Sequence, residues 1–175
     1  MWETLIMKYS KIINYDTNNG RFFRVSLFVS GCGKIPKCKS CHNKDAWNFS
    51  YGTEYTQKTE DYIIELLKNP RIKGFSLIGG EPMDNLEGGE LLQLVKRIKR
   101  ELPHIEIYCW SGYNFNNLIL NDVKREFLKH IDMLRDGEFI LDLKDLNQYL
   151  QGSTNQRYVN CKESLNQGRV VEFEF

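Results

Sequence analysis

Three cysteines lie close together in one short segment and are candidate ligands of a metal centre. Cys32, Cys38 and Cys41 fall within ten positions of the sequence. Three thiolates can hold three corners of a cubane iron–sulfur cluster and leave one iron without a protein ligand. Structural zinc would need a closed fourth position, for which His42 is available, but adjacent residues such as Cys41 and His42 seldom wrap one tetrahedral ion. Reduced cysteines without a special role are the third interpretation.

A glycine pair and a serine are further candidates for a ligand site. Gly79 and Gly80 follow the strand-like residues 74–78. Glycines at the carboxyl end of a parallel strand let bare backbone approach a ligand. A tight turn whose glycines only supply positive φ angles is the alternative. Ser111 follows another expected strand, where it can reach a ligand or only cap the next helix.

The elements that must position these residues alternate between strand and helix. Leucine and isoleucine recur at helical spacing over residues 87–102, and Pro103 stops this helix. Thr56 or Thr59 can cap an earlier helix that ends at Pro70. Such alternation predicts parallel strands joined by crossover helices, and therefore an α/β fold. We expect strands at residues 25–30, 74–78, 105–110 and 131–134, a further helix at 116–130, a short strand at 11–15 and a terminal strand at 169–175.

Composition and charge describe an ordinary globular chain. Its 175 residues, 41% hydrophobic and 27% charged, predict one domain, residues 1–175, with a sizeable core. Lys+Arg 24 against Asp+Glu 23 leaves a net charge of +1, which argues against a nucleic-acid surface. No apolar run approaches the ~20 residues of a membrane span, and the N-terminus lacks the basic region and cleavage site of a signal peptide. We therefore expect a cytoplasmic protein whose thiols stay reduced.

The cysteine segment resembles the signature of radical S-adenosylmethionine enzymes that activate glycyl-radical enzymes. It reads C-x2-C-H-N-x3-W over residues 38–47, after R-x3-F-x2-G-C over residues 24–32. Within that group the pattern is most similar to the small activases of anaerobic ribonucleotide reductase, which the chain length also suits. Four further stretches agree with these activases: Gly79-Gly80-Glu81-Pro82, Trp110-Ser111-Gly112-Tyr113, Asp136-Gly137 and Gly152-Ser153-x-Asn155-Gln156-Arg157.

The sequence departs from the family pattern in two places. The family usually has three residues between its first two cysteines, whereas five, residues 33–37, separate Cys32 from Cys38 here. This insertion leaves the ligand count unchanged and lengthens the path from Cys32. The family also tends to have a second glycine where this chain has Phe22. Nothing in the sequence accounts for that change.

The resemblance implies a fold and a reaction. The fold is an α/β open partial (β/α) barrel of about five to six mostly parallel strands. Cys32, Cys38 and Cys41 would bind a [4Fe-4S] cluster, whose open iron takes the amino and carboxylate groups of S-adenosyl-L-methionine. One electron then breaks a carbon–sulfur bond, giving methionine and a 5′-deoxyadenosyl radical that takes hydrogen from a glycine of a partner protein. The cofactors perform the hard step, so we expect no catalytic side chain.

The resemblance also implies partners and cofactor contacts. The partners are the large subunit of anaerobic ribonucleotide reductase, as protein substrate, and a flavodoxin- or ferredoxin-like electron donor, in the host cytoplasm if the chain is viral. Carbonyls at Gly79 and Gly80 would accept hydrogen bonds from the methionine ammonium. Adenine contacts are implied around the last cysteine, although a packing role for His42 is equally open. The residues expected to bind the nucleotide cofactor are Ser40, His42, Gly79, Gly80, Glu81, Pro82 and Ser111.

Two other function classes stay open. A radical S-adenosylmethionine enzyme acting on a small molecule would share the cysteine loop but should lack the stretch at residues 152–157. A zinc-binding interaction module would be colourless, hold one zinc and unfold with chelator. Residues 155–157 are a candidate site for the partner's glycine loop, with a solvated turn as the alternative.

Overall fold

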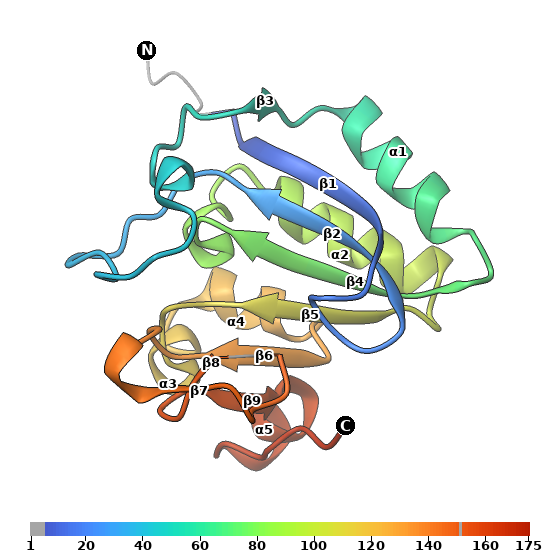
Figure 1. Ribbon diagram of the computed structural model, residues 1–175. Coiled ribbons are helices and arrows are strands. Elements are labelled where there is room, and N and C mark those ends of the chain that lie inside the picture. Colours follow the sequence, from blue (N-terminus) through green and yellow to red (C-terminus); the bar gives the residue numbers. More distant parts are fainter. Residues whose placement is uncertain (1–5, 151) are drawn as a thin grey trace.

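The protein is built on strands that alternate with helices, and this computed structural model describes residues 6–150 and 152–175 (Figure 1). The strands are β1 (Lys8–Asp16), β2 (Phe23–Val29), β3 (Thr53–Glu54), β4 (Ile72–Gly79), β5 (Glu106–Trp110), β6 (Met133–Asp136), β7 (Lys144–Asp145), β8 (Gly152–Ser153) and β9 (Arg157–Asn160). The α-helices are α1 (Gln57–Leu67), α2 (Glu90–Glu101), α3 (Phe115–Leu118), α4 (Asp122–Leu128) and α5 (Cys161–Gln167). Short 3-10 helices are η1 (Lys44–Trp47), η2 (Pro82–Asp84) and η3 (Leu141–Leu143).

Seven strands form one mixed sheet in the order β3-β1-β2-β4-β5-β6-β9. Its central strands β2, β4, β5 and β6 run parallel, whereas β1, β3 and β9 are antiparallel to their neighbours. Strands β7 and β8 pair separately. The expected α/β class with parallel strands is confirmed. The pairings give an open sheet and do not show the expected barrel.

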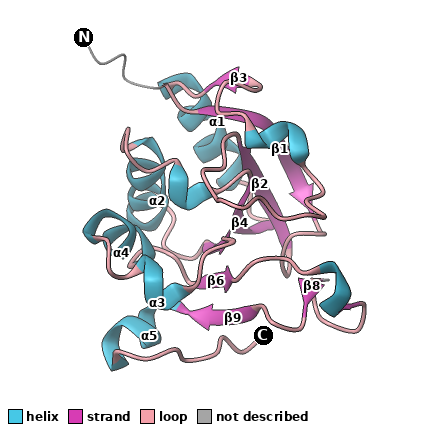
Figure 2. Ribbon diagram, turned by 90° about the vertical axis from the view of Figure 1, so that its left-hand side faces the viewer, coloured by secondary structure: helices cyan, strands magenta, loops and turns pink. Residues whose placement is uncertain are grey.

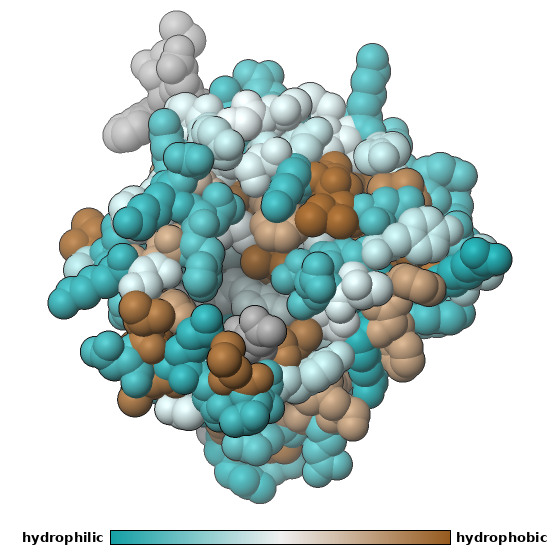
Figure 3. Space-filling view, in the orientation of Figure 1, coloured by the Kyte–Doolittle hydropathy of each residue, from teal (hydrophilic) through white to brown (hydrophobic). Residues whose placement is uncertain are grey.

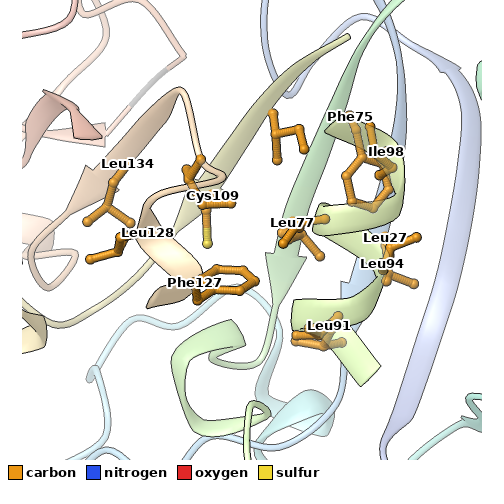
Figure 4. Close-up of a cluster of buried hydrophobic side chains, with 14 of the residues drawn as sticks. Leu27, Phe75, Leu77, Leu91, Leu94, Ile98, Cys109, Phe127, Leu128 and Leu134 are labelled. Atoms are coloured by element: carbon orange, nitrogen blue, oxygen red, sulfur yellow. The ribbon is translucent and has the colours of Figure 1, made fainter. Parts of the chain in front are cut away.

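Helices cover one face of the sheet and bury the main core against it. Figure 2 shows α1, α2 and α4 on the same side of the strands. Leu27 of β2 and Leu77 of β4 face Leu91 and Leu94 of α2, and all four side chains are fully buried (Figure 4). Burying one such side chain contributes about 1.5–3 kcal/mol. This layer therefore provides the rigid frame that carries the loops.

The two longest helices follow the sequence signals. Thr56 caps α1, because its side chain accepts a hydrogen bond from the backbone N–H of Thr59. In α2 the apolar residues recur every three to four positions and face the sheet, while Lys99 and Arg100 lie in the last turn, where cations suit the helix dipole. Within the described residues, every helix is too short or too polar to cross a lipid bilayer.

The chain after residue 115 differs from expectation. The single helix predicted at residues 116–130 is two helices, because Asn121 leaves the helical conformation and caps α4 by accepting a hydrogen bond from the Lys124 N–H at 3.0 Å. The strand predicted at 169–175 is wrong: this segment forms only an isolated bridge between Glu172 and Val159. The edge strand is instead β9, and α5 follows it without a helical pattern strong enough to have been predicted.

The backbone at position 22 has a conformation that favours glycine over the phenylalanine found here. Phe22 has a backbone φ of 63°, in the left-handed region. Glycine adopts this region without steric cost, which gives the family's glycine a physical reason. A bulky residue such as phenylalanine is destabilised by roughly 1–2 kcal/mol there. The Phe22 side chain is 57% exposed, so packing offsets little of that cost.

Candidate active site

The candidate residues meet at one edge of the sheet because the central strands are parallel. The carboxyl ends of β2, β4, β5 and β6 point the same way, toward the left in Figure 1. The cysteine loop follows β2, Gly79 ends β4 with Gly80 directly after it, Ser111 follows β5 and Gly137 follows β6. This is the edge at which open α/β sheets bind ligands.

The base of the cysteine loop is fastened by backbone hydrogen bonds. The N–H of Gly31 donates to the carbonyl of Ala46 at 2.7 Å, and the N–H of Cys32 donates to that of Trp47 at 3.2 Å. The carbonyl of Gly31 in turn accepts from the Glu81 N–H at 2.7 Å. The first cysteine is therefore held between the η1 segment and the end of β4.

The segment between the first two cysteines is also held in place by an ion pair and hydrogen bonds. Lys34 pairs with Glu138 at 2.9 Å, and its side chain is only 14% exposed. The Gly33 N–H donates to the Asp84 carboxylate at 2.7 Å, and the Lys37 ammonium donates to the carbonyl of the first cysteine. The longer loop thus follows a defined path. None of these side chains was a sequence-based candidate, and no local signal links Lys34 to a residue 104 positions away.

The three thiols of this loop are candidate ligands of an iron–sulfur cluster. Cys32, Cys38 and Cys41 are free and partly exposed. Burial raises the pKa of the Cys32 and Cys38 thiols, and the nearby ammonium groups of Lys37 and Lys34 act in the opposite direction. Within the described residues, no three His, Cys, Asp or Glu side chains converge where one ion could sit. Three soft thiolate donors on one loop are the donor set of a [4Fe-4S] cluster that keeps one iron open.

A hollow of about 130 Å³ adjoins the second cysteine of the loop. Four of the predicted cofactor residues line it, together with groups from the ends of β5 and β6. The lining consists of Cys38, Ile78, Gly79, Gly80, Glu81, Trp110, Ser111, Gly112, Gly137, Phe139 and Gln156. Phe139 was not a sequence-based candidate, and Gln156 was one only for the partner's glycine loop.

The other three predicted residues lie outside this lining. Pro82 is buried in the first turn of η2. His42 is exposed, and its ring packs on Phe139 with 5.4 Å between centroids. Ser40 is half-buried beside the last cysteine. The His42 ring therefore contacts Phe139, while an adenine contact stays a prediction.

Close packing explains why glycines occupy the last position of β4 and the position after it. Gly79 has a φ of 111°, a conformation that suits glycine, and a Cβ there would overlap the backbone of Val29. A Cβ on Gly80 would overlap the carbonyl oxygens of Gly31 and Ala46. The pair thus lets the end of β4 lie directly against the base of the cysteine loop.

Glu81 joins the ends of two strands. Its carboxylate is 2% exposed and accepts hydrogen bonds from the N–H groups of Met83 at 3.1 Å and Gly112 at 2.7 Å. Burial raises the pKa of this carboxyl to about 7, although the hydrogen bonds lower it. Glu81 therefore positions the turn after β5 and titrates near neutral pH.

A Glu81→Gln variant should have a flatter stability profile between pH 5 and 8. Because the folded pKa lies above the unfolded value, the stabilising contribution of Glu81 is complete below about pH 4.5 and is lost as the pH rises through 7. Glutamine cannot ionise, so the difference between the two profiles should reach roughly 3 kcal/mol. Urea unfolding of the cluster-free protein at several pH values measures it, with exposed Glu65→Gln as control. Parallel profiles would show that Glu81 titrates normally.

Residues 155–157 brace the turn after β6. The Arg157 side chain pairs with the carboxylate of residue 136, and its Nε lies 2.9 Å from Oδ1. Gln156 donates to the carbonyl of residue 137 and Asn155 to that of residue 138, each at 2.8 Å. Their side chains are thus engaged within the protein and support the wall of the hollow.

Comparisons with known proteins agree with this geometry. The family described as "4Fe-4S single cluster domain" matches residues 18–159. The chain is 43% identical over 152 residues to the anaerobic ribonucleoside-triphosphate reductase-activating protein of Vibrio cholerae, covering 86% of this chain and 96% of the relative. Proteins of the same name from Escherichia coli K12 and Enterobacteria phage T4 are 39% and 35% identical over 86% of this chain, covering 96% and 92% of their own lengths. The chain belongs to the family of anaerobic ribonucleoside-triphosphate reductase-activating proteins.

Proposed function

We propose that the protein is a radical S-adenosylmethionine activase that installs a glycyl radical on an anaerobic ribonucleoside-triphosphate reductase. One observation carries this proposal: a loop with three free thiols lies against Gly79 and Gly80, and Cys38 lines the same hollow as these glycines. The names of the relatives and the match to a 4Fe-4S domain family support it.

In this proposal the chain positions and shields its cofactors. Cys32, Cys38 and Cys41 would each hold one iron of a [4Fe-4S] cluster and leave the fourth iron open. When bound, the cluster supplies the electron that cleaves S-adenosyl-L-methionine to methionine and the 5′-deoxyadenosyl radical that takes hydrogen from the reductase glycine. No protein group has to act as acid, base or nucleophile.

The residues around the hollow would hold the nucleotide cofactor. Carbonyls of Gly79 and Gly80 are candidate acceptors for its ammonium group. Ser111 lines the same hollow and would contact the ribose or the methionine portion. Glu81 and Pro82 would act by fixing the turn around these groups. Beside the last cysteine, Ser40 and His42 would contact adenine, largely through their backbone.

The face of the sheet opposite the helices would receive the protein substrate. This face is hollowed near its centre (Figure 3). We propose that residues 1–175 act as one activase domain, that the open sheet serves as a partial barrel, and that the glycine loop of the reductase large subunit enters from this side. A flavodoxin- or ferredoxin-like protein would supply the electron, in the cytoplasm, where thiols stay reduced.

Anaerobic reconstitution with iron and sulfide tests the proposal directly. The loaded protein, given S-adenosyl-L-methionine and a strong reductant, should form 5′-deoxyadenosine. With its reductase present, it should also produce the doublet of a glycyl radical in electron paramagnetic resonance. Product without any glycyl radical would favour a small-molecule substrate. Zinc binding without iron uptake would overturn the enzyme assignment.

A further inference from the structure

A second surface feature lies at the opposite edge of the sheet from the cysteines. It is a hollow of about 590 Å³ around the starts of β2 and β4. Phe22, Phe23 and Tyr149 line it and are 57%, 43% and 47% exposed. Tyr15 adjoins it, 40% exposed, with its ring 5.5 Å from that of Phe23. We call these four aromatic residues, together with Arg71 and Lys73, the aromatic–basic patch.

Backbone strain is concentrated at this patch. Within the described residues, the three non-glycine residues with positive φ are Tyr15 at 53°, Phe22 at 63° and Leu150 at 64°. Two belong to the patch, and the third follows Tyr149. The strained loop is held in place, because the buried guanidinium of Arg135 donates to the carbonyls of Tyr149 and Leu150. Backbone strain that a fold retains at neighbouring positions supports a functional hypothesis for that surface.

The patch carries positive charge that the rest of the described chain leaves unpaired. Arg71 and Lys73 are exposed and line the hollow. Neither forms an ion pair with any residue in the described part of the chain. Arg21, beside them, is neutralised by Glu106 at 2.5 Å. The complementary ligand would therefore present carboxylates next to apolar or aromatic side chains.

The distance of the patch from the cysteine loop favours the protein substrate over the electron donor as its ligand. β2 has seven residues, which places the patch roughly 20 Å from the cysteine loop at ~3.3 Å per residue. An electron donor has to dock near the cluster, so it does not suit this edge. The protein substrate is large, so when its glycine reaches the cysteine loop the rest of it must also cover surface farther away, where the patch lies.

We infer that the aromatic–basic patch is a docking surface for an acidic, apolar segment of the reductase, an inference that rests on the proposed function. Aromatic rings on a rigid backbone are strong interface anchors, and the two cations would steer the acidic segment. The strain at Phe22 is then retained because it presents the ring to the partner.

Binding of the loaded activase to its reductase tests this inference. Phe22→Gly should weaken binding at least fivefold, and Arg71→Glu with Lys73→Glu at least tenfold, with the wild-type affinity falling as salt rises. Phe22→Gly should unfold at the same or a higher temperature, because glycine relieves the strain. Both variants should form 5′-deoxyadenosine without reductase at the wild-type rate. Matched controls on α1 are Tyr62→Ala and Lys58→Glu, which should bind normally.

The outcomes separate this inference from the proposed function. Unchanged affinity in both patch variants, or an equal loss in the α1 controls, would overturn the docking surface. Wild-type protein that self-associates through the patch, shown by light scattering of wild type and variants, would overturn it in favour of a second copy. Failure of loaded wild-type protein to form 5′-deoxyadenosine would instead count against the proposed chemistry, whatever the variants bind.

Discussion

Replacing Cys38 by alanine is expected to abolish cluster binding and lower 5′-deoxyadenosine formation by ~100-fold or more. Cys38 is the only one of the three loop cysteines that lines the hollow beside Gly79 and Gly80 in the described structure. Two thiolates would remain, which leaves two irons of a cubane without protein ligands. Iron and sulfide content after anaerobic reconstitution, with the absorbance near 400 nm, measures the loss separately from activity.

Cys161→Ala is the matched control for this substitution. Cys161 is also a free thiol, but it is fully buried at the start of α5, and burial raises its pKa. Its loss should cost some stability through packing and leave iron content unchanged. A Cys38→Ala protein that retains the full iron load would contradict the assigned ligand set.

Replacing Arg24 by methionine is expected to destabilise the fold by about 3 kcal/mol. Arg24 is 0% exposed, and burial lowers its pKa to about 10, so it stays charged at neutral pH. Its guanidinium donates to Ser76 Oγ at 2.7 Å and to the carbonyls of Phe75 and Glu106 at 2.9 and 2.8 Å. It also lies 3.9 Å from the centre of the Tyr108 ring. Methionine fills similar space but leaves these buried acceptors without their donor.

Urea unfolding of the cluster-free protein measures this effect. Arg100→Met is the control, because the Arg100 side chain is 70% exposed on α2 and should change stability little. The folded fraction of Arg24→Met should still bind iron normally, since Arg24 lies at the start of β2 and the cysteines follow its end. An unchanged unfolding midpoint would show that the buried guanidinium contributes nothing net, as some buried charges do.

The parts of the fold that sequence could predict are those with local signals. The parallel strands carry continuous apolar runs, and α2 has a strict helical period, so both were predicted close to their observed bounds. The cysteine spacing and the Gly79-Gly80 pair predicted a ligand site, and the fold brings Cys38 and these glycines to the same edge of the sheet. The backbone strain at Phe22 could not be predicted, because a phenylalanine in the sequence does not reveal its backbone φ angle.

The remainder depends on long-range contacts. The β9 segment looks polar in the sequence because it contains Arg157. In the fold, the charge of Arg157 is paired with a buried carboxylate that is distant in sequence. Residues 169–175 alternate as a strand would, yet Phe173 and Phe175 pack on Tyr108 instead of extending the sheet. The Lys34–Glu138 pair joins segments that no period or motif relates. Such contacts are visible only once the topology is known.

The hydrogen-bonded base of the cysteine loop allows the length of this loop to differ between relatives. Because hydrogen bonds from Gly31 and Cys32 fix the point where the loop leaves the sheet, extra residues beyond it change only the closure entropy of a short segment. Going from three to five intervening residues costs about 0.5 kcal/mol, since closure entropy grows with the logarithm of length. The loop can therefore lengthen at almost no cost in folding free energy while the sheet that carries it stays unchanged. The longer segment can also form its own stabilising contacts, such as the Lys34–Glu138 ion pair.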